Sequence, residues 1–299
     1  MYFKTIFIFL CFSFLQANNV DKYHENLCKL LVNTSNSIDN YFVDDNSSER
    51  SKTHAEFSTS FATETHLSLE KDIRFRLRLN LPKIEKNLRL VFEDDTSDNL
   101  LYDGTTLNDQ HLDSKQYYLR LEYFNFMKDT FKTRVGAGVK IRRGNLVPYA
   151  NARSRYELYA QNKHKAELYN RFRYYSDGEI ENSLEFNALY TIRDDLYAIW
   201  DNTFFHINTT PYEVLANDFS FVTVLNDKQH IRYGFGISSE VSKFEALDVS
   251  YYYLHGSFHH VFYKDWAYYT ISPSILQREI NNFDTSYRLL LNFGIYFNN

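Results

Sequence analysis

The chain has 299 residues, of which 44% are hydrophobic and 18% aromatic, and its formal net charge is −5. Phe and Tyr number 26 and 25, whereas Gly, Pro and Cys are scarce at 9, 4 and 2. This mild acidity gives no reason to expect a nucleic-acid-binding protein. The shortage of Gly and Pro excludes a collagen-like or linker-like chain. Two cysteines can build neither a disulfide framework nor a four-cysteine zinc site, and no motif predicts a bound cofactor.

The first 17 residues have the pattern of an export signal. Lys4 is followed by the apolar run Ile6 to Leu15 and by the small residue Ala17. A short apolar core that ends in a small residue is typical of a secretory signal peptide. At roughly ten residues the core is too short for a helix that crosses a bilayer, which needs about twenty. We predict a signal peptide over residues 1–17, and the alternative is a buried amphipathic helix.

Residues 18–52 are expected to form a helix and a linker before the main domain. Val20, Tyr23, Leu27 and Leu30 recur at helical spacing, which predicts a short amphipathic helix over residues 20–33. The stretch 33–51 is rich in Asn, Ser and Asp and is interpreted as a linker. Cys28 lies on the predicted helix, and we interpret it as a small packed residue.

From about residue 53 to the end of the chain, the hydrophobic period changes from 3.6 to 2. In the segment 73–81 the odd positions are apolar and the even positions are mostly Arg, which places the two sets on opposite faces of a strand. Pro82, Pro148, Pro211 and Pro273 lie at predicted strand ends. Fourteen segments show this alternation: 53–66, 73–81, 87–95, 116–126, 131–142, 147–160, 165–177, 181–192, 196–208, 217–225, 230–240, 245–258, 261–272 and 287–297.

Two architectures fit many alternating strands, a soluble sheet protein and a transmembrane barrel. Most predicted strands hold about 9–14 residues, which suits a tilted crossing of a bilayer, whereas soluble strands average about five or six. The polar faces carry long charged side chains. Aromatic pairs such as Tyr117-Tyr118, Tyr174-Tyr175 and Tyr268-Tyr269 lie near strand ends, as interfacial girdles require. We predict an all-β, antiparallel, up-and-down transmembrane barrel of 12–14 strands over residues 53–299.

The last strand carries a resemblance to a known class. Tyr287, Leu289, Leu291, Phe293, Ile295 and Phe297 alternate along it, and only Asn298 and Asn299 follow. With the export signal, this pattern resembles the bacterial outer-membrane β-barrel proteins over residues 53–297, although Phe is usually their last residue. The resemblance implies a location in the outer membrane of a Gram-negative bacterium, with the helix and linker of residues 18–52 in the periplasm. It also implies contact with outer-membrane lipids and lipopolysaccharide, and recognition of the last strand by the barrel-assembly machinery.

The longest connection, residues 94–115, carries five Asp residues and is expected on the outer side of the membrane. Its Asp residues have neither the spacing nor the terminal Glu of a calcium-binding loop. We therefore interpret the segment as a solvated loop rather than a divalent-cation site.

The inward face of the first strands is predicted to be basic. A wall of Arg in a wet lumen concentrates anions, which would give a porin-like channel with small anionic solutes as partners. The alternative is a closed structural or adhesion barrel in which Arg and Glu pair across the lumen and fill it. The predicted pore-lining residues are Arg74, Arg76, Arg78, Arg89, Arg120, Arg134, Arg142, Arg153, Arg155, Arg171, Arg173, Glu93 and Glu122.

One cluster, residues 255–260, suggests chemistry. His255 and Ser257 share one side of an extended strand, and parity with Val249, Tyr251 and Tyr253 assigns that side to lipid. Outer-membrane phospholipases place a His-x-Ser pair in this way, so the resemblance would make Ser257 a nucleophile and His255 its base, with Asp265 as the orienting acid. An acyl hydrolase is the least favoured function, because the resemblance stops at two residues. His259 and His260 point to opposite faces, and we expect them to anchor the interface rather than bind metal.

Overall fold

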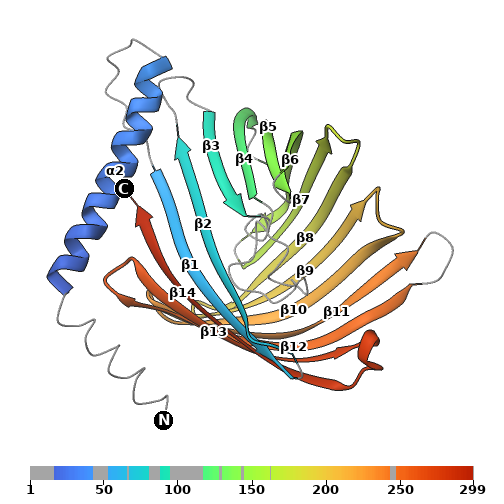
Figure 1. Ribbon diagram of the computed structural model, residues 1–299. Coiled ribbons are helices and arrows are strands. Elements are labelled where there is room, and N and C mark those ends of the chain that lie inside the picture. Colours follow the sequence, from blue (N-terminus) through green and yellow to red (C-terminus); the bar gives the residue numbers. More distant parts are fainter. Residues whose placement is uncertain are drawn as a thin grey trace.

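The fold is a single barrel of antiparallel strands with a helix outside it. The computed structural model describes residues 17–42, 53–65, 67–80, 88–94, 117–127, 130–142, 145–161, 163–242 and 247–298. Each strand pairs antiparallel with its neighbours in the chain, and β1 also pairs with β14, which closes the barrel (Figure 1). The elements are α2 (Ala17–Phe42), β1 (Thr53–Glu64), β2 (Glu70–Asn80), β3 (Leu88–Asp94), β4 (Tyr117–Met127), β5 (Phe131–Arg142), β6 (Asn145–Gln161), β7 (His164–Tyr175), β8 (Ile180–Arg193), β9 (Leu196–Ile207), β10 (Tyr212–Asn226), β11 (Gln229–Ser242), β12 (Asp248–Tyr263), β13 (Ala267–Arg278), the 3₁₀ helix η2 (Glu279–Asn281) and β14 (Thr285–Asn298).

These fourteen strands confirm the predicted up-and-down barrel at the upper end of the expected 12–14. Strand length ranges from 7 residues in β3 to 17 in β6, and most strands exceed the nine to eleven residues of a tilted bilayer crossing. The barrel end where β1 begins and β14 ends is called the terminal end below, and the opposite end the loop end. The segment 94–115 joins β3 to β4 at the loop end, but residues 95–116 lie outside the described part of the chain.

The boundary between β12 and β13 differs from the prediction. The sequence pattern places a turn at residues 259–260, whereas β12 continues to Tyr263 and the turn comes at 264–266. Lys264 occupies this turn with a positive φ of 47°. Pro273 therefore lies inside β13, where its missing N–H interrupts pairing with β12 between His255↔Ser274 and Phe258↔Ile271. The segment 258–263 is aromatic apart from Val261, so it contains no turn residue that would mark either boundary.

Helix α2 is longer than predicted. It covers Ala17–Phe42, so residues 33–42 are helical and the linker predicted over 33–51 is wrong for that stretch. Ile38, Tyr41 and Phe42 continue the apolar spacing after Leu31, which explains the extension. Within the described residues, no helix combines the length and apolarity needed to cross a membrane. Residues 1–16 and 43–52 lie outside those residues, so the signal peptide stays a prediction.

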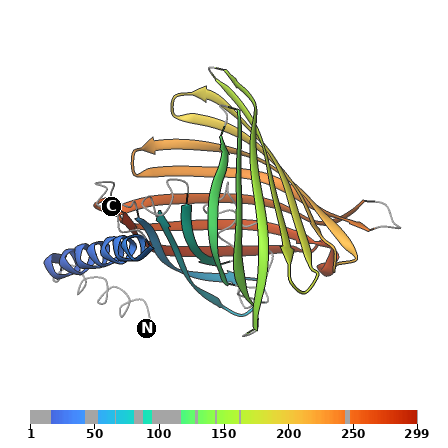
Figure 2. The same cartoon turned by 90° about the horizontal axis from the view of Figure 1, so that it is seen from above.

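The helix lies outside the barrel beside the ends of β1 and β14, not in the lumen (Figures 1 and 2). His24 stacks on Trp266 with ring centroids 4.4 Å apart, and its Nε2 lies 2.8 Å from the carbonyl oxygen of Tyr296. Asp21 pairs with Lys264 at 2.6 Å and accepts a hydrogen bond from the Tyr263 hydroxyl. The helix is therefore fixed to the terminal end through the turn between β12 and β13. Cys28 is half-buried beside His24, as a packed residue would be.

Candidate functional site

The interior of the barrel is polar and its exterior is apolar. Arg120, Glu122 and Asp218 are each at most 2% exposed, whereas Leu119 and Phe235 on the alternate positions are 43% and 53% exposed. A polar interior and an apolar exterior are the reverse of the distribution in a soluble protein and match a barrel in lipid. The polar interior, and not a surface cleft, is therefore the candidate site.

The paired tyrosines correct one expectation about the aromatic girdles. Adjacent residues of a strand point to opposite faces, so only one member of each pair faces outward. Tyr174 is 51% exposed, whereas Tyr175 and Tyr118 are fully buried in the interior. The inward tyrosines therefore belong to the lumen wall instead of the girdle.

A group of arginines surrounds one carboxylate midway along β3–β6. Arg120 Nε donates a 2.7 Å hydrogen bond to Glu122 Oε1, and Arg153 Nη1 lies 3.6 Å from the same oxygen. Arg89 is the direct cross-strand neighbour of Glu122, and Arg134 also interacts with it electrostatically. We call these five residues the arginine patch. Among the described residues, this part of the wall thus gathers four guanidinium groups around one carboxylate and is rich in basic side chains.

Two glycines make room for the arginine patch. A Cβ at Gly138 would lie 2.7 Å from the Arg120 Cβ, and one at Gly136 would lie 2.7 Å from Asn151 Oδ1. Distances below 3.0 Å are not tolerated without movement of the neighbours. Long side chains can therefore lie flat against β5 only because these positions carry none.

Closer to the loop end, two cations lie among tyrosines and beside two carboxylates, Glu181 and Glu179, and Glu179 Oε1 lies 3.6 Å from Lys140 Nζ. Lys140 Nζ and Arg173 Nη1 each donate a 2.9 Å hydrogen bond to one of the two oxygens of Glu181. Lys140 Nζ also lies 4.4 Å from the centroid of the Tyr175 ring, and Arg173 Cζ lies 4.3 Å from that of Tyr118. Cation–π contacts of this kind add to the ion pairs. This group, called the tyrosine cluster below, is compact and carries less excess charge than the arginine patch.

The other predicted lumen residues lie along the same face, mostly in pairs. Arg74 Nε donates to Asp72 at 2.8 Å, Arg76 Nη1 lies 3.3 Å from Glu56 Oε2, and Arg155 Nε donates to Glu167 at 2.8 Å. Arg78 and Arg171 are half-buried. The side chains of Glu93 and Arg142 lie outside the described part of the chain. Each ion pair named above joins residues on one strand or on strands at most three apart, so these pairs follow the wall instead of crossing the lumen.

A second network lies on the opposite part of the sheet, in β9–β12. Asp218 is the shared acceptor: Arg232 Nη2 lies 3.0 Å from its Oδ1, and the Tyr253 hydroxyl donates to its Oδ2 at 3.0 Å. His255 Nε2 lies 2.8 Å from that same oxygen, and Arg232 also bonds Asp201 at 3.2 Å. The network joins four strands and holds two buried carboxylates to one arginine. It makes this part of the wall less basic than the arginine patch.

The lipid-facing assignment of His255 and Ser257 is wrong. His255 is 7% exposed and bonds Asp218 in the interior, and Tyr251 and Tyr253 share that face, while Tyr252 and Leu254 are exposed. A bulge at Ser238/Ser239 shifts the register between Val249 and Tyr251, so parity with Val249 does not continue along the strand. Asp265 is 93% exposed in its turn and pairs with Lys228, so it cannot orient His255. The hydrolase arrangement at the lipid face is therefore absent from the described residues.

His259 and His260 point to opposite faces, as the alternation predicts. His259 Nδ1 lies 2.9 Å from Thr270 Oγ1 on the inward side, and His260 Nδ1 lies 3.1 Å from the Tyr269 hydroxyl. Among the described residues, no three His, Cys, Asp or Glu side chains converge in a way that could hold a metal ion.

Asp218 is the functional candidate that the sequence analysis missed. Asp218 lies two residues from Ser220 on the same strand, so the alternation would have placed both side chains inward. Its partners could not be predicted in this way, because they lie 14 to 37 residues away in the chain. Only the strand register brings these partners together, and that register depends on bulges that the sequence does not mark.

Comparison with known proteins identifies the fold. No family model matches the chain, and no curated protein matches it. Among solved structures, a loop-deletion variant of OmpT, an outer membrane protein of Vibrio cholerae, aligns with a TM-score of 0.52 and 10% identity over 82% of this chain and 98% of that chain. In-vitro folded OmpT of the same organism aligns with a TM-score of 0.50 and 10% identity over 85% of this chain and 100% of that chain. The chain thus has the fold of the bacterial outer-membrane β-barrel proteins, and the suspected class is confirmed at that level.

Proposed function

We propose that this chain is an outer-membrane channel whose wall favours small anionic solutes. The observation that carries the proposal is the arginine patch, in which Arg89, Arg120, Arg134 and Arg153 gather around the carboxylate of Glu122 on the lumen face. Excess positive charge on a low-dielectric wall raises the local concentration of anions and lowers their entry barrier.

Two features support an open lumen over a filled one. Barrel diameter grows with strand number: about eight strands leave an interior that side chains fill, and 16–18 leave an aqueous channel. Fourteen strands lie much closer to the second case. In addition, the ion pairs described above run along the wall, so these pairs do not close the centre of the lumen. We further propose that the terminal end faces the periplasm and that the exterior contacts outer-membrane lipids and lipopolysaccharide. We also propose that the barrel-assembly machinery recognises the last strand, β14.

A closed structural or adhesion barrel is the second candidate. The tyrosine cluster favours it, because Lys140 and Arg173 are paired with two carboxylates, Glu179 and Glu181, and are packed against rings. If similar packing continued across the lumen, solutes could not pass.

Ion selectivity separates the two candidates. The reversal potential of the refolded protein would be measured in a planar bilayer under a KCl gradient, and we expect it to favour chloride. The double variant Arg89→Gln/Arg134→Gln removes two charges but keeps the Arg120–Glu122 bond, so its reversal potential should shift towards zero. Arg193→Gln is the matched control, because Arg193 is 66% exposed at the turn between β8 and β9 and should leave selectivity unchanged. Cation preference in the wild type, or equal selectivity in all three proteins, would refute the proposal.

A further inference from the structure

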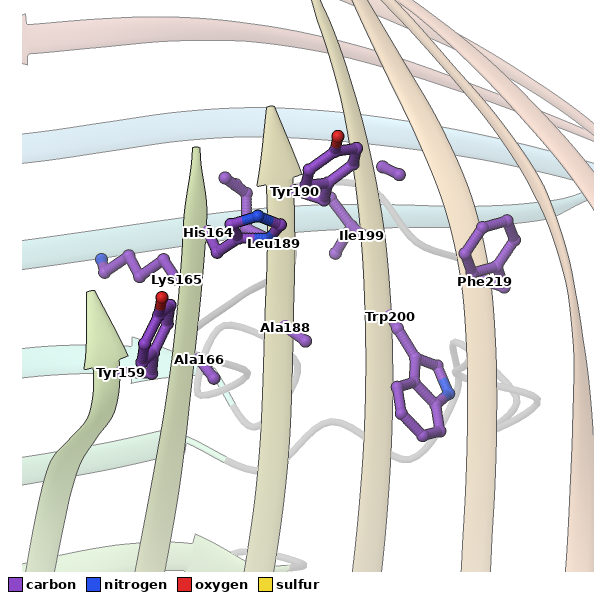
Figure 3. Close-up of a pocket in the computed structure, with 11 residues that line it drawn as sticks. Tyr159, His164, Lys165, Ala166, Ala188, Leu189, Tyr190, Ile199, Trp200 and Phe219 are labelled. Carbon is purple, nitrogen blue, oxygen red and sulfur yellow. The ribbon is translucent and has the colours of Figure 1, made fainter. Parts of the chain in front are cut away.

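The exterior of the barrel contains a concave site near the terminal end. A cavity of about 490 Å³ lies against β6–β10. Tyr159, His164 and Tyr190 stand on one side of it, Trp200 stands on the other, and Ala166 and Ala188 lie between them (Figure 3). The volume is within the range of about 300–1,000 Å³ that is usual for small-molecule sites.

The cavity results from small residues placed beside large ones in one row of the sheet. Ala166 pairs with Ala188, and Ala188 pairs with Trp200 on the next strand. In the neighbouring row on the same face, Leu168 pairs with Phe186, and no such gap is expected there. Trp200 is 49% exposed and Tyr190 42% exposed, so the walls project from a floor of methyl groups.

The site changes from apolar to polar along the strands. His164 stacks on Tyr190 with ring centroids 4.6 Å apart, and the Tyr159 hydroxyl donates a 2.9 Å hydrogen bond to Gln161 Oε1. These polar groups lie next to the turns at the terminal end, whereas Ala166, Ala188 and Trp200 lie further into the apolar belt. Tyr and His at such a position present a polar edge at the interface of a membrane.

We propose that this groove binds one glycerophospholipid of the leaflet at the terminal end. An acyl chain lies over Ala166 and Ala188 against Trp200, and the ester and phosphate groups face Tyr159, His164 and Tyr190. The proposal rests on membrane insertion of the barrel, which belongs to the proposed function. Lipid is the occupant that the observations favour, because the groove is continuous with the apolar exterior. Its volume of about 490 Å³ is also that of a site for one small molecule.

Trp200 provides a direct probe. The chain has 2 tryptophans, so Trp266→Phe leaves Trp200 as the only one. The folded protein in detergent micelles would be titrated with a phosphatidylethanolamine brominated on its acyl chains, and quenching of Trp200 fluorescence recorded. A specific site predicts quenching that saturates at one lipid per barrel. Ala188→Leu fills the floor and should weaken the apparent affinity about tenfold, which corresponds to about 1.4 kcal/mol.

Ala137→Leu is the matched control, because Ala137 is an exposed exterior residue of β5 outside the groove. It should change the affinity less than about twofold. If Ala188→Leu failed to fold, Ala166→Leu would test the same floor. Quenching that rises linearly with lipid and is equal in all variants would overturn the proposal. So would a change of oligomeric state in Ala188→Leu, which would make the groove a contact between copies. The titration uses folded protein in micelles, so a barrel that binds lipid without conducting refutes only the channel.

Discussion

Removal of the Asp218 charge should destabilise the barrel strongly. Asp218 is 2% exposed and is the shared acceptor of Arg232, Tyr253 and His255 at 2.8–3.0 Å. Asp218→Asn keeps the shape but replaces one acceptor oxygen by a donor group. That group faces donors, and Arg232 retains only Asp201 as a charged partner among its bonds described above. Loss of one partner from a buried ion pair costs about 3–5 kcal/mol. We therefore expect the free energy of unfolding to fall by about this amount.

The assay is equilibrium unfolding in urea, with the barrel folded into lipid vesicles and tryptophan fluorescence as the signal. Asp195→Asn is the matched control, because Asp195 is 53% exposed and pairs with Arg193 in a turn. Exposed pairs contribute about 0–1 kcal/mol, so this variant should unfold almost as the wild type does. Equal, small losses in both variants would refute the reasoning, since they would mean that water already solvates Asp218.

Two further predictions concern packing and the helix. Gly294→Ala should lower the free energy of unfolding by about 1–3 kcal/mol, because its Cβ would lie 2.3 Å from the Tyr268 ring. Gly256→Ala, whose nearest contact would be 3.8 Å away, should change it little; equal effects in urea unfolding would contradict this. Attachment of α2 should depend on pH. The hydrogen bond from Lys264 lowers the pKa of Asp21 below its usual value, and the bond to Asp21 raises the pKa of Lys264. The Asp21 contribution is thus present above its unfolded pKa of about 3.9 and is lost as the pH falls through the lower folded value. The Lys264 contribution is present below about 10.4 and is lost as the pH rises through the higher folded value. As the pH falls through the folded pKa of Asp21, hydrogen exchange of α2 should accelerate in the wild type, after correction for the intrinsic exchange rate. In Asp21→Asn the corrected exchange rate should not change over the same acidic range. Identical profiles would show that the pair does not hold the helix.

The alternation of apolar and polar residues was sufficient to predict the barrel and a range of 12–14 strands, which includes the fourteen observed. Strands such as β2 carry Arg74, Arg76 and Arg78 on one face and apolar residues on the other, so a period of 2 determines both faces. The same alternation places Gly136 and Gly138 of β5 on the inward face, where a Cβ at Gly138 would lie 2.7 Å from the Arg120 Cβ.

The pattern failed where both faces of a strand are aromatic. In β12, Tyr251, Tyr252 and Tyr253 are consecutive, so composition cannot show which of them faces lipid. The bulge at Ser238/Ser239 then reverses the parity read from Val249. The assignment of Val249, Tyr251 and Tyr253 to lipid placed His255 on the wrong face and concealed its bond to Asp218. Bulges depend on hydrogen bonding between neighbouring strands, so the sequence of one strand does not show where they occur.

The most direct test of the central claim is a current recording from single barrels in a planar bilayer, made with protein whose folding is verified by a gel shift on boiling. We predict steady openings with a linear current–voltage relation in symmetric KCl, because the polar interior is lined by charges paired along the wall. Folded protein that inserts into the bilayer but passes no current would contradict the account, since it would mean that side chains fill the lumen.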